Sequence, residues 1–126
     1  MSTETAQSSL EEILLRLKIW LEKQYAANLS EVILYGSQAR GDAKENSDID
    51  ILIVLKNFVS YSQELKKTSH FIADLSLEYD TVVSRAFITE ARFQSENSPF
   101  VMNVKREGII LWPQNNSHYL LKPSVV

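Results

Sequence analysis

Two aspartates at the entrance to an apolar strand constrain this chain more than any other feature. Residues 47–55 read SDIDILIVL, and the run ILIVL predicts a buried β-strand. Asp48 and Asp50 stand at its start, although aspartate is among the poorest strand formers. Alternate residues of a strand point to the same face, so the two carboxylates would lie about 7 Å apart. Such a pair is tolerable if a divalent cation lies between them, and oxygen ligands favour Mg²⁺ or Mn²⁺.

A second group of candidate residues precedes the aspartates. Residues 31–36, EVILYG, predict a short strand that ends at Gly36. A glycine there lets a bound group approach the backbone, and Ser37 adds a hydroxyl and an N–H. A short helix start after Ser37 would point further N–H groups outward, which favours an anion, and Arg40 adds a positive charge. We therefore expect Gly36, Ser37 and Arg40 to bind phosphate beside the carboxylate pair.

A third carboxylate is expected, because two metal ions generally need more ligands than one pair supplies. Asp80 opens the predicted strand 80–88, DTVVSRAFI, and would be within reach if that strand lies beside 47–55. Glu78 is the alternative, although the preceding helix is expected to hold it. Asp48, Asp50 and Asp80 are thus the predicted metal ligands and catalytic residues.

The remaining pattern predicts an α/β fold, with a small mixed β-sheet and helices packed mainly on one face. Apolar residues at helical spacing predict helices from Ser9 to about Asn28 and over 60–78. Thr89 is expected to cap a short helix, Ser98-Pro99 to open another that stops at Gly108, and 109–112 to form a fourth strand. We expect one domain, 9–112, followed by a tail, 113–126, that is a candidate flexible or partner-binding segment.

Composition narrows the classes of function. The chain has 126 residues, no cysteine, and two histidines that make no metal-binding pattern. No apolar run is long enough to span a membrane and no secretory signal is present, so we expect a cytoplasmic protein. The net charge is −3, the pI is about 5.4, and the basic residues are dispersed. Tight binding to nucleic acid is not expected.

Gly36-Ser37, ten further residues and then Asp48-x-Asp50 resemble the signature of the nucleotidyltransferase superfamily that includes DNA polymerase β and kanamycin nucleotidyltransferase. The short chain and the form GSQARG…SDIDILIV are most similar to the minimal nucleotidyltransferases, over roughly residues 10–112. The resemblance implies that Gly36 and Ser37 contact nucleotide phosphates and that Asp48 and Asp50 hold two Mg²⁺ ions. It also implies a third aspartate on a later strand, which we match to Asp80.

The resemblance further implies ATP as co-substrate and a partner, because minimal nucleotidyltransferases are typically encoded beside a HEPN-domain RNase toxin. The expected function is transfer of AMP from ATP to a hydroxyl of that toxin, with tyrosine as the expected acceptor, which neutralises it. Two alternatives stay open. One is transfer to a small-molecule hydroxyl, although the added helical domain usual in such enzymes is missing. The other is an idle antitoxin that acts by binding alone.

Overall fold

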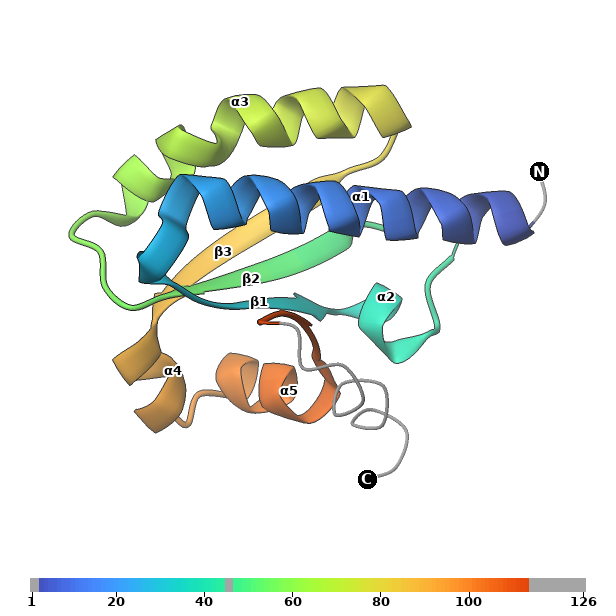
Figure 1. Ribbon diagram of the computed structural model, residues 1–126. Coiled ribbons are helices and arrows are strands. Elements are labelled where there is room, and N and C mark those ends of the chain that lie inside the picture. The colour runs from blue at the N-terminus through green and yellow to red at the C-terminus, as the bar shows by residue number, and fades with distance from the viewer. Residues whose placement is uncertain (1–2, 45–46, 114–126) are drawn as a thin grey trace.

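A computed structural model describes residues 3–44 and 47–113 (Figure 1). The helices are α1 (Thr3–Tyr25), the 3-10 turn η1 (Ala26–Asn28), α2 (Ser37–Arg40), α3 (Tyr61–Tyr79), α4 (Glu90–Ser95) and α5 (Pro99–Glu107). The strands are β1 (Leu29–Tyr35), β2 (Ile49–Leu55), β3 (Val83–Thr89) and β4 (Ile109–Trp112). The predicted α/β class is confirmed.

The four strands form one mixed sheet in the order β3-β2-β1-β4. β1 pairs with β2 and with β4 in antiparallel fashion, whereas β2 and β3 run parallel. The parallel pair requires a crossover, which α3 supplies. The short polar connection between β1 and β2 carries the single turn of α2. The predicted third strand therefore does lie beside the strand that follows the aspartates.

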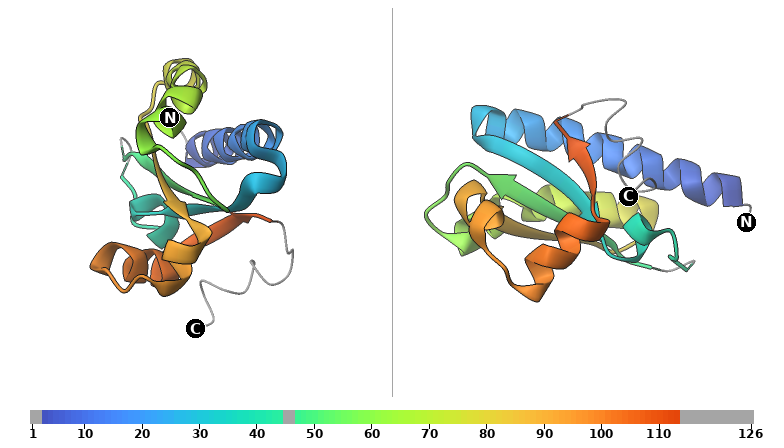
Figure 2. Two further views of the ribbon diagram at one scale, coloured as in Figure 1. Left: turned by 90° about the vertical axis from the view of Figure 1, so that its left-hand side faces the viewer. Right: turned by 90° about the horizontal axis from the view of Figure 1, so that it is seen from below.

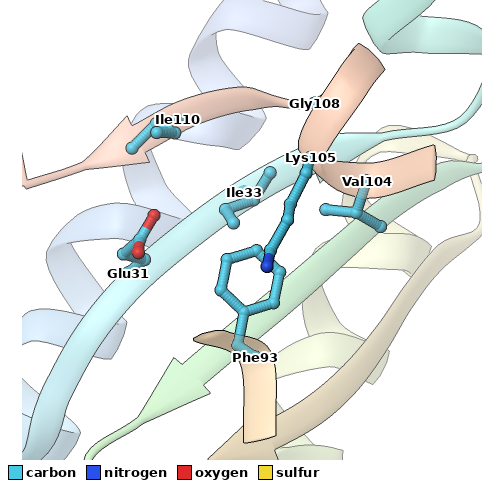
Figure 3. A pocket seen from close by; sticks show the side chains of 7 residues that line it. All are labelled: Glu31, Ile33, Phe93, Val104, Lys105, Gly108 and Ile110. Atoms are coloured by element: carbon cyan, nitrogen blue, oxygen red, sulfur yellow. The ribbon is translucent and has the colours of Figure 1, made fainter. Parts of the chain in front are cut away.

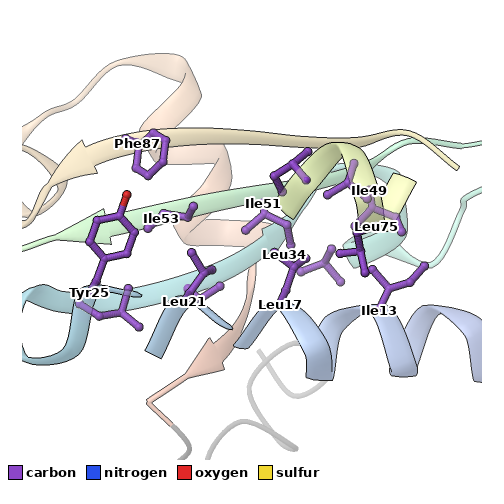
Figure 4. Close-up of a cluster of buried hydrophobic side chains, with 14 of the residues drawn as sticks. Ile13, Leu17, Leu21, Tyr25, Leu34, Ile49, Ile51, Ile53, Leu75 and Phe87 are labelled. Carbon is purple, nitrogen blue, oxygen red and sulfur yellow. The ribbon is translucent and has the colours of Figure 1, made fainter. Parts of the chain in front are cut away.

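The two long helices, α1 and α3, cover one face of the sheet, as two further views show (Figure 2). Their apolar positions at helical spacing meet the alternate residues of the strands, and Leu17, Ile51 and Leu75 have no exposed surface (Figure 4). Burial of each such side chain contributes about 1.5–3 kcal/mol relative to exposure. This face is the principal core and fixes the orientation of β1 and β2.

The opposite face of the sheet carries the two short helices, α4 and α5 (Figures 1 and 2). A smaller apolar cluster joins them to the strands and includes Ile33, Leu52, Val54, Ile88, Phe93, Val101 and Val104. The expected caps are present, because Thr89 accepts a hydrogen bond from the N–H of Arg92 and Ser98 accepts one from Val101. Alternate residues of a strand face the same side of the sheet, so Asp50 faces the same side as Leu52 and Val54. This is the side that the short helices cover.

Two predicted boundaries are wrong. Helix α1 begins at Thr3, not at Ser9, because the preceding residues continue the helix without any apolar periodicity that would reveal it. The third strand begins at Val83, not at Asp80. Asp80 has a φ of 50° and caps α3 in the left-handed conformation, which Asp tolerates better than most residues.

The C-terminal tail predicted over 113–126 falls almost wholly outside the described residues, which end at Pro113. The internal pair 45–46 also lies outside them. None of the described helices combines the length and the apolar character that a membrane span needs.

Candidate functional site

Gly36 and Asp50 meet across the β1–β2 pair, and their contact defines the site. Tyr35, the last residue of β1, pairs with Asp50 in the register of the two strands. Gly36 follows with a φ of 77°, and a Cβ built there would collide with Oδ2 of Asp50. Only glycine accepts both this conformation and this close approach without strain. The Gly-Ser element and the aspartate pair, which are separate in sequence, are therefore joined in space.

The two aspartates experience different surroundings. Asp48 is exposed, whereas Asp50 is half-buried at the start of β2. Burial raises the pKa of the Asp50 carboxyl above its usual range, and the negative charge of Asp48 raises it further. The same carboxylate contributes to a raised pKa of the Tyr35 hydroxyl, after burial as the larger cause. The two carboxylates therefore concentrate negative potential at the start of β2.

The N-terminal turn of α2 lies directly beside this potential. Ser37 is half-buried and opens the turn, and the carbonyl of Gly36 already accepts hydrogen bonds from Ala39 and Arg40. The first N–H groups of a helix have no partner within the helix, so those of Ser37 and Gln38 point outward. The Gln38 side chain donates to the carbonyl of Ser47 at 3.4 Å and so ties α2 to the loop before Asp48.

Arg40 is exposed and is held by acids on both sides. Its Nε lies 3.2 Å from Oδ2 of Asp42, and its Nη1 lies 3.4 Å from Oε1 of Glu107 at the end of α5. Arg40 and Glu107 border an open pocket of about 220 Å³. The pocket is lined by Tyr35, Gly36, Arg40, Phe100, Asn103, Val104 and Glu107. Arg40 therefore lies near the Gly-Ser element, as predicted, but with its charge partly neutralised.

Asp80 and Glu78, the two candidates for the third acid, lie elsewhere. Asp80 is exposed in the turn that ends α3, and Glu78 forms an ion pair with Arg16 on α1 at 2.8 Å. In the part of the chain that the structure describes, no three acidic or histidine side chains come together in a way that could hold a metal ion. The structure thus brings Asp48 and Asp50 together but does not add either candidate to them.

Two residues of the site carry no motif signal. Tyr35 is a half-buried aromatic beside Asp50, and its ring packs edge-on against Phe100 at a centroid distance of 5.3 Å. Ser84 on β3 is the neighbour of Asp50 on the other side. Tyr35 could have been noticed because it precedes Gly36 directly. Ser84 could not, because its position depends on the register of a strand distant in sequence.

A second pocket, of about 100 Å³, lies between α4, α5 and the strands β1 and β4 (Figure 3). Its walls are largely apolar, and Nζ of Lys105 lies 5.2 Å from the centre of the Phe93 ring. None of the predicted site residues lines this pocket. We therefore place the candidate site at Gly36, Ser37, Asp48 and Asp50 and not here.

The donor set of this site fits a divalent cation. Two carboxylates stand beside N–H and hydroxyl groups, and within the described residues no sulfur or imidazole ligand joins them. Hard oxygen ligands of this kind suit Mg²⁺, which is commonly held by one or two carboxylates together with water and substrate phosphates. The arrangement can place a nucleotide phosphate between the α2 turn and a cation held by the aspartates.

Comparisons with known proteins agree with this geometry. Residues 15–111 match a family model described as "Nucleotidyltransferase domain". A relative from Methanocaldococcus jannaschii, named "Putative protein adenylyltransferase", is 37% identical over 93 residues, which are 73% of this chain and 87% of the relative.

Two solved structures share the fold. A crystal structure named as that of a putative nucleotidyltransferase from Sulfolobus solfataricus aligns with a TM-score of 0.60 and 25% identity, covering 88% of this chain and 89% of the other. A chain from a toxin–antitoxin crystal structure with AMP-PNP aligns with a TM-score of 0.55 and 21% identity, covering 82% and 77%.

Proposed function

Because the chain belongs to the family of nucleotidyltransferase domains, we propose that it transfers AMP from ATP to a hydroxyl of a partner protein. The proposed partner is an RNase toxin of the HEPN class, the proposed acceptor is a tyrosine, and the product is a silenced toxin. The reaction would take place in the cytoplasm, where ATP and RNA are both present. The single observation that carries the proposal is the contact between Gly36 and Asp50, because it joins a phosphate-binding turn to a metal-binding carboxylate pair.

The comparisons support the choice of acceptor class. Relatives that this chain covers over most of their length carry the name "Putative protein adenylyltransferase", and a structural neighbour comes from a toxin–antitoxin structure with AMP-PNP, an ATP analogue. A partner protein is thus the natural source of the acceptor surface.

The residues of the site have distinct roles in this proposal. Ser37 and the N–H groups of the α2 turn bind the β- and γ-phosphates. Asp48 and Asp50 would hold Mg²⁺, which when bound would supply charge neutralisation for the phosphates of the nucleotide. Arg40 adds a positive charge once a phosphate replaces its contacts with Asp42 and Glu107.

The chemical step balances without a further reactant. The acceptor oxygen forms a bond to the α-phosphorus of ATP, the bond from that phosphorus to the bridging oxygen of the β-phosphate breaks, and pyrophosphate leaves. The hydroxyl proton passes to solvent or to a nearby base. A tyrosine hydroxyl has a pKa near 10 and is mostly protonated at neutral pH, so positioning beside concentrated positive charge is required. Catalysis is then mainly positioning and charge neutralisation.

One observation favours a second candidate. The described residues place no third acid beside Asp48 and Asp50, which suits an antitoxin that binds its toxin without modifying it. The two candidates separate in an RNase assay. The toxin is incubated with this protein and either ATP or α,β-methylene ATP, whose α-phosphorus cannot be transferred. We expect RNase activity to fall with ATP only. Equal inhibition with both nucleotides would support inhibition by binding alone.

A further inference from the structure

We propose that Ser84 stands where a third metal-binding acid would lie beside Asp48 and Asp50. The side chains of this chain then hold one divalent cation and not two. The inference rests on the proposed function, because it concerns the same site. It departs from the prediction of two ions and a third aspartate. The observation behind it is the register between β2 and β3.

The register places Ser84 directly beside Asp50. β2 and β3 pair in parallel, with Ile49 opposite Val83 and Asp50 opposite Ser84. Neighbouring strands lie about 4.8 Å apart, and paired residues of a parallel ladder point to the same face. Val83 joins the core under α1 and α3, so Ser84 faces the opposite side, which is the side of the Asp50 carboxylate.

No acid of β3 reaches this position. Asp80 precedes Ser84 by four residues and lies before β3, because it is itself the left-handed C-cap of α3. The next residue, Arg85, points to the other face, where it donates to Oγ1 of Thr68 at 2.9 Å and to the carbonyl of Leu65 at 2.8 Å. β3 therefore contributes one neutral hydroxyl to the site and no charge of either sign.

The charge count then limits the number of ions. Two carboxylates balance one divalent cation, and Mg²⁺ is commonly bound in this way with water and phosphate oxygens completing its shell. Among the described residues no further carboxylate joins this pair, so a second cation would bring two more positive charges that these residues do not balance. It could be held only by phosphate oxygens that arrive with the substrate. In the absence of nucleotide, we therefore expect a single metal site.

The test is a titration of the protein with Mn²⁺ in the absence of nucleotide, in which binding is measured by calorimetry and by electron paramagnetic resonance. The unmodified protein should bind one Mn²⁺. Ser84→Asp should tighten Mn²⁺ binding about tenfold or more, because it adds a third negative charge beside Asp50. Thr89→Asp is the matched control: it places the same charge at the far end of β3, and aspartate also serves as an N-cap there. It should leave Mn²⁺ binding unchanged.

Several results would overturn the inference. Two Mn²⁺ ions bound to the unmodified protein would do so, as would equal Mn²⁺ affinity of Ser84→Asp and Thr89→Asp. If Ser84→Asp does not fold, the Ser84→Ala variant is measured instead. Its Mn²⁺ affinity should stay within about twofold of that of the unmodified protein, because one neutral group replaces another. A larger loss would make Ser84 a metal ligand and overturn the inference. Binding of one Mn²⁺ without AMP transfer would refute the proposed function and leave this inference intact. Binding of none would overturn both.

Discussion

Replacement of Asp50 by asparagine should stabilise the metal-free protein. Asp50 is half-buried, its pKa is raised by burial and then by Asp48, and it lies against the backbone of Gly36. A carboxyl whose pKa is higher in the folded state than in the unfolded state destabilises the fold once it ionises. The cost is absent below the unfolded pKa of about 3.9, develops as the pH rises from there to the raised folded pKa, and is complete above the folded pKa.

The magnitude follows from the separation of the two charges. At about 7 Å, the spacing of alternate strand residues, the repulsion is about 0.6 kcal/mol in water and about 2.4 kcal/mol at an effective dielectric constant of about 20. Asp48 is exposed, so the lower figure dominates, and partial burial of Asp50 adds to it. We expect Asp50→Asn to raise the free energy of unfolding by about 1 kcal/mol, or the melting temperature by about 4 °C.

The assay is thermal unfolding in EDTA at several pH values. The gain should be largest at pH 7, should shrink toward acidic pH, and should disappear when saturating Mg²⁺ is added to the unmodified protein. Asp74→Asn, an exposed replacement on α3, is the control and should change the melting temperature little. A stability gain that is the same at pH 3 and pH 7 would refute the electrostatic argument, and a loss of stability would show that Asp50 is a structural residue.

Three further predictions concern the same site. Gly36→Ala should lower the free energy of unfolding by about 1–3 kcal/mol through backbone strain and should abolish ATP binding. Gly41 has a similar φ of 83° but open space around it, so Gly41→Ala should also be less stable but should keep ATP binding. ATP should bind more weakly in EDTA than in Mg²⁺ by calorimetry, and equal affinities would contradict the cation site. Asp80→Asn should keep the fold, because asparagine accepts the left-handed conformation, and should also keep the rate of AMP transfer. Loss of transfer would make Asp80 the third acid.

Much of the fold was predictable because its signals are local. Thr89, Ser98 and Pro99 mark helix starts through their own hydrogen bonding and dihedral preferences, and the structure confirms each. The start of α1 was missed because its first turns carry no apolar periodicity. The start of β3 was missed because a β-branched run does not reveal that Asp80 still belongs to the cap of α3.

Part of the site could be predicted from the sequence and part could not, and the difference has a physical cause. Gly36 and Asp50 belong to two adjacent strands joined by a short connection, so the motif spacing nearly determines their contact. Ser84 and Phe100 come to the site through longer connections. A shift of one residue in the register of β3 would turn a different side chain toward Asp50, and this register depends on packing against strands and helices distant in sequence. The third acid was therefore the weakest inference.

The central claim is tested most directly by the intact mass of the proposed toxin partner after incubation with this protein and Mg²⁺-ATP. The account predicts that the toxin gains the mass of one or more AMP units, that its RNase activity falls in proportion, and that pyrophosphate is released in equal amount. The variant with both Asp48→Asn and Asp50→Asn should fold and produce no such gain. A toxin that is inhibited at unchanged mass, or that is modified equally by the double variant, would contradict the account.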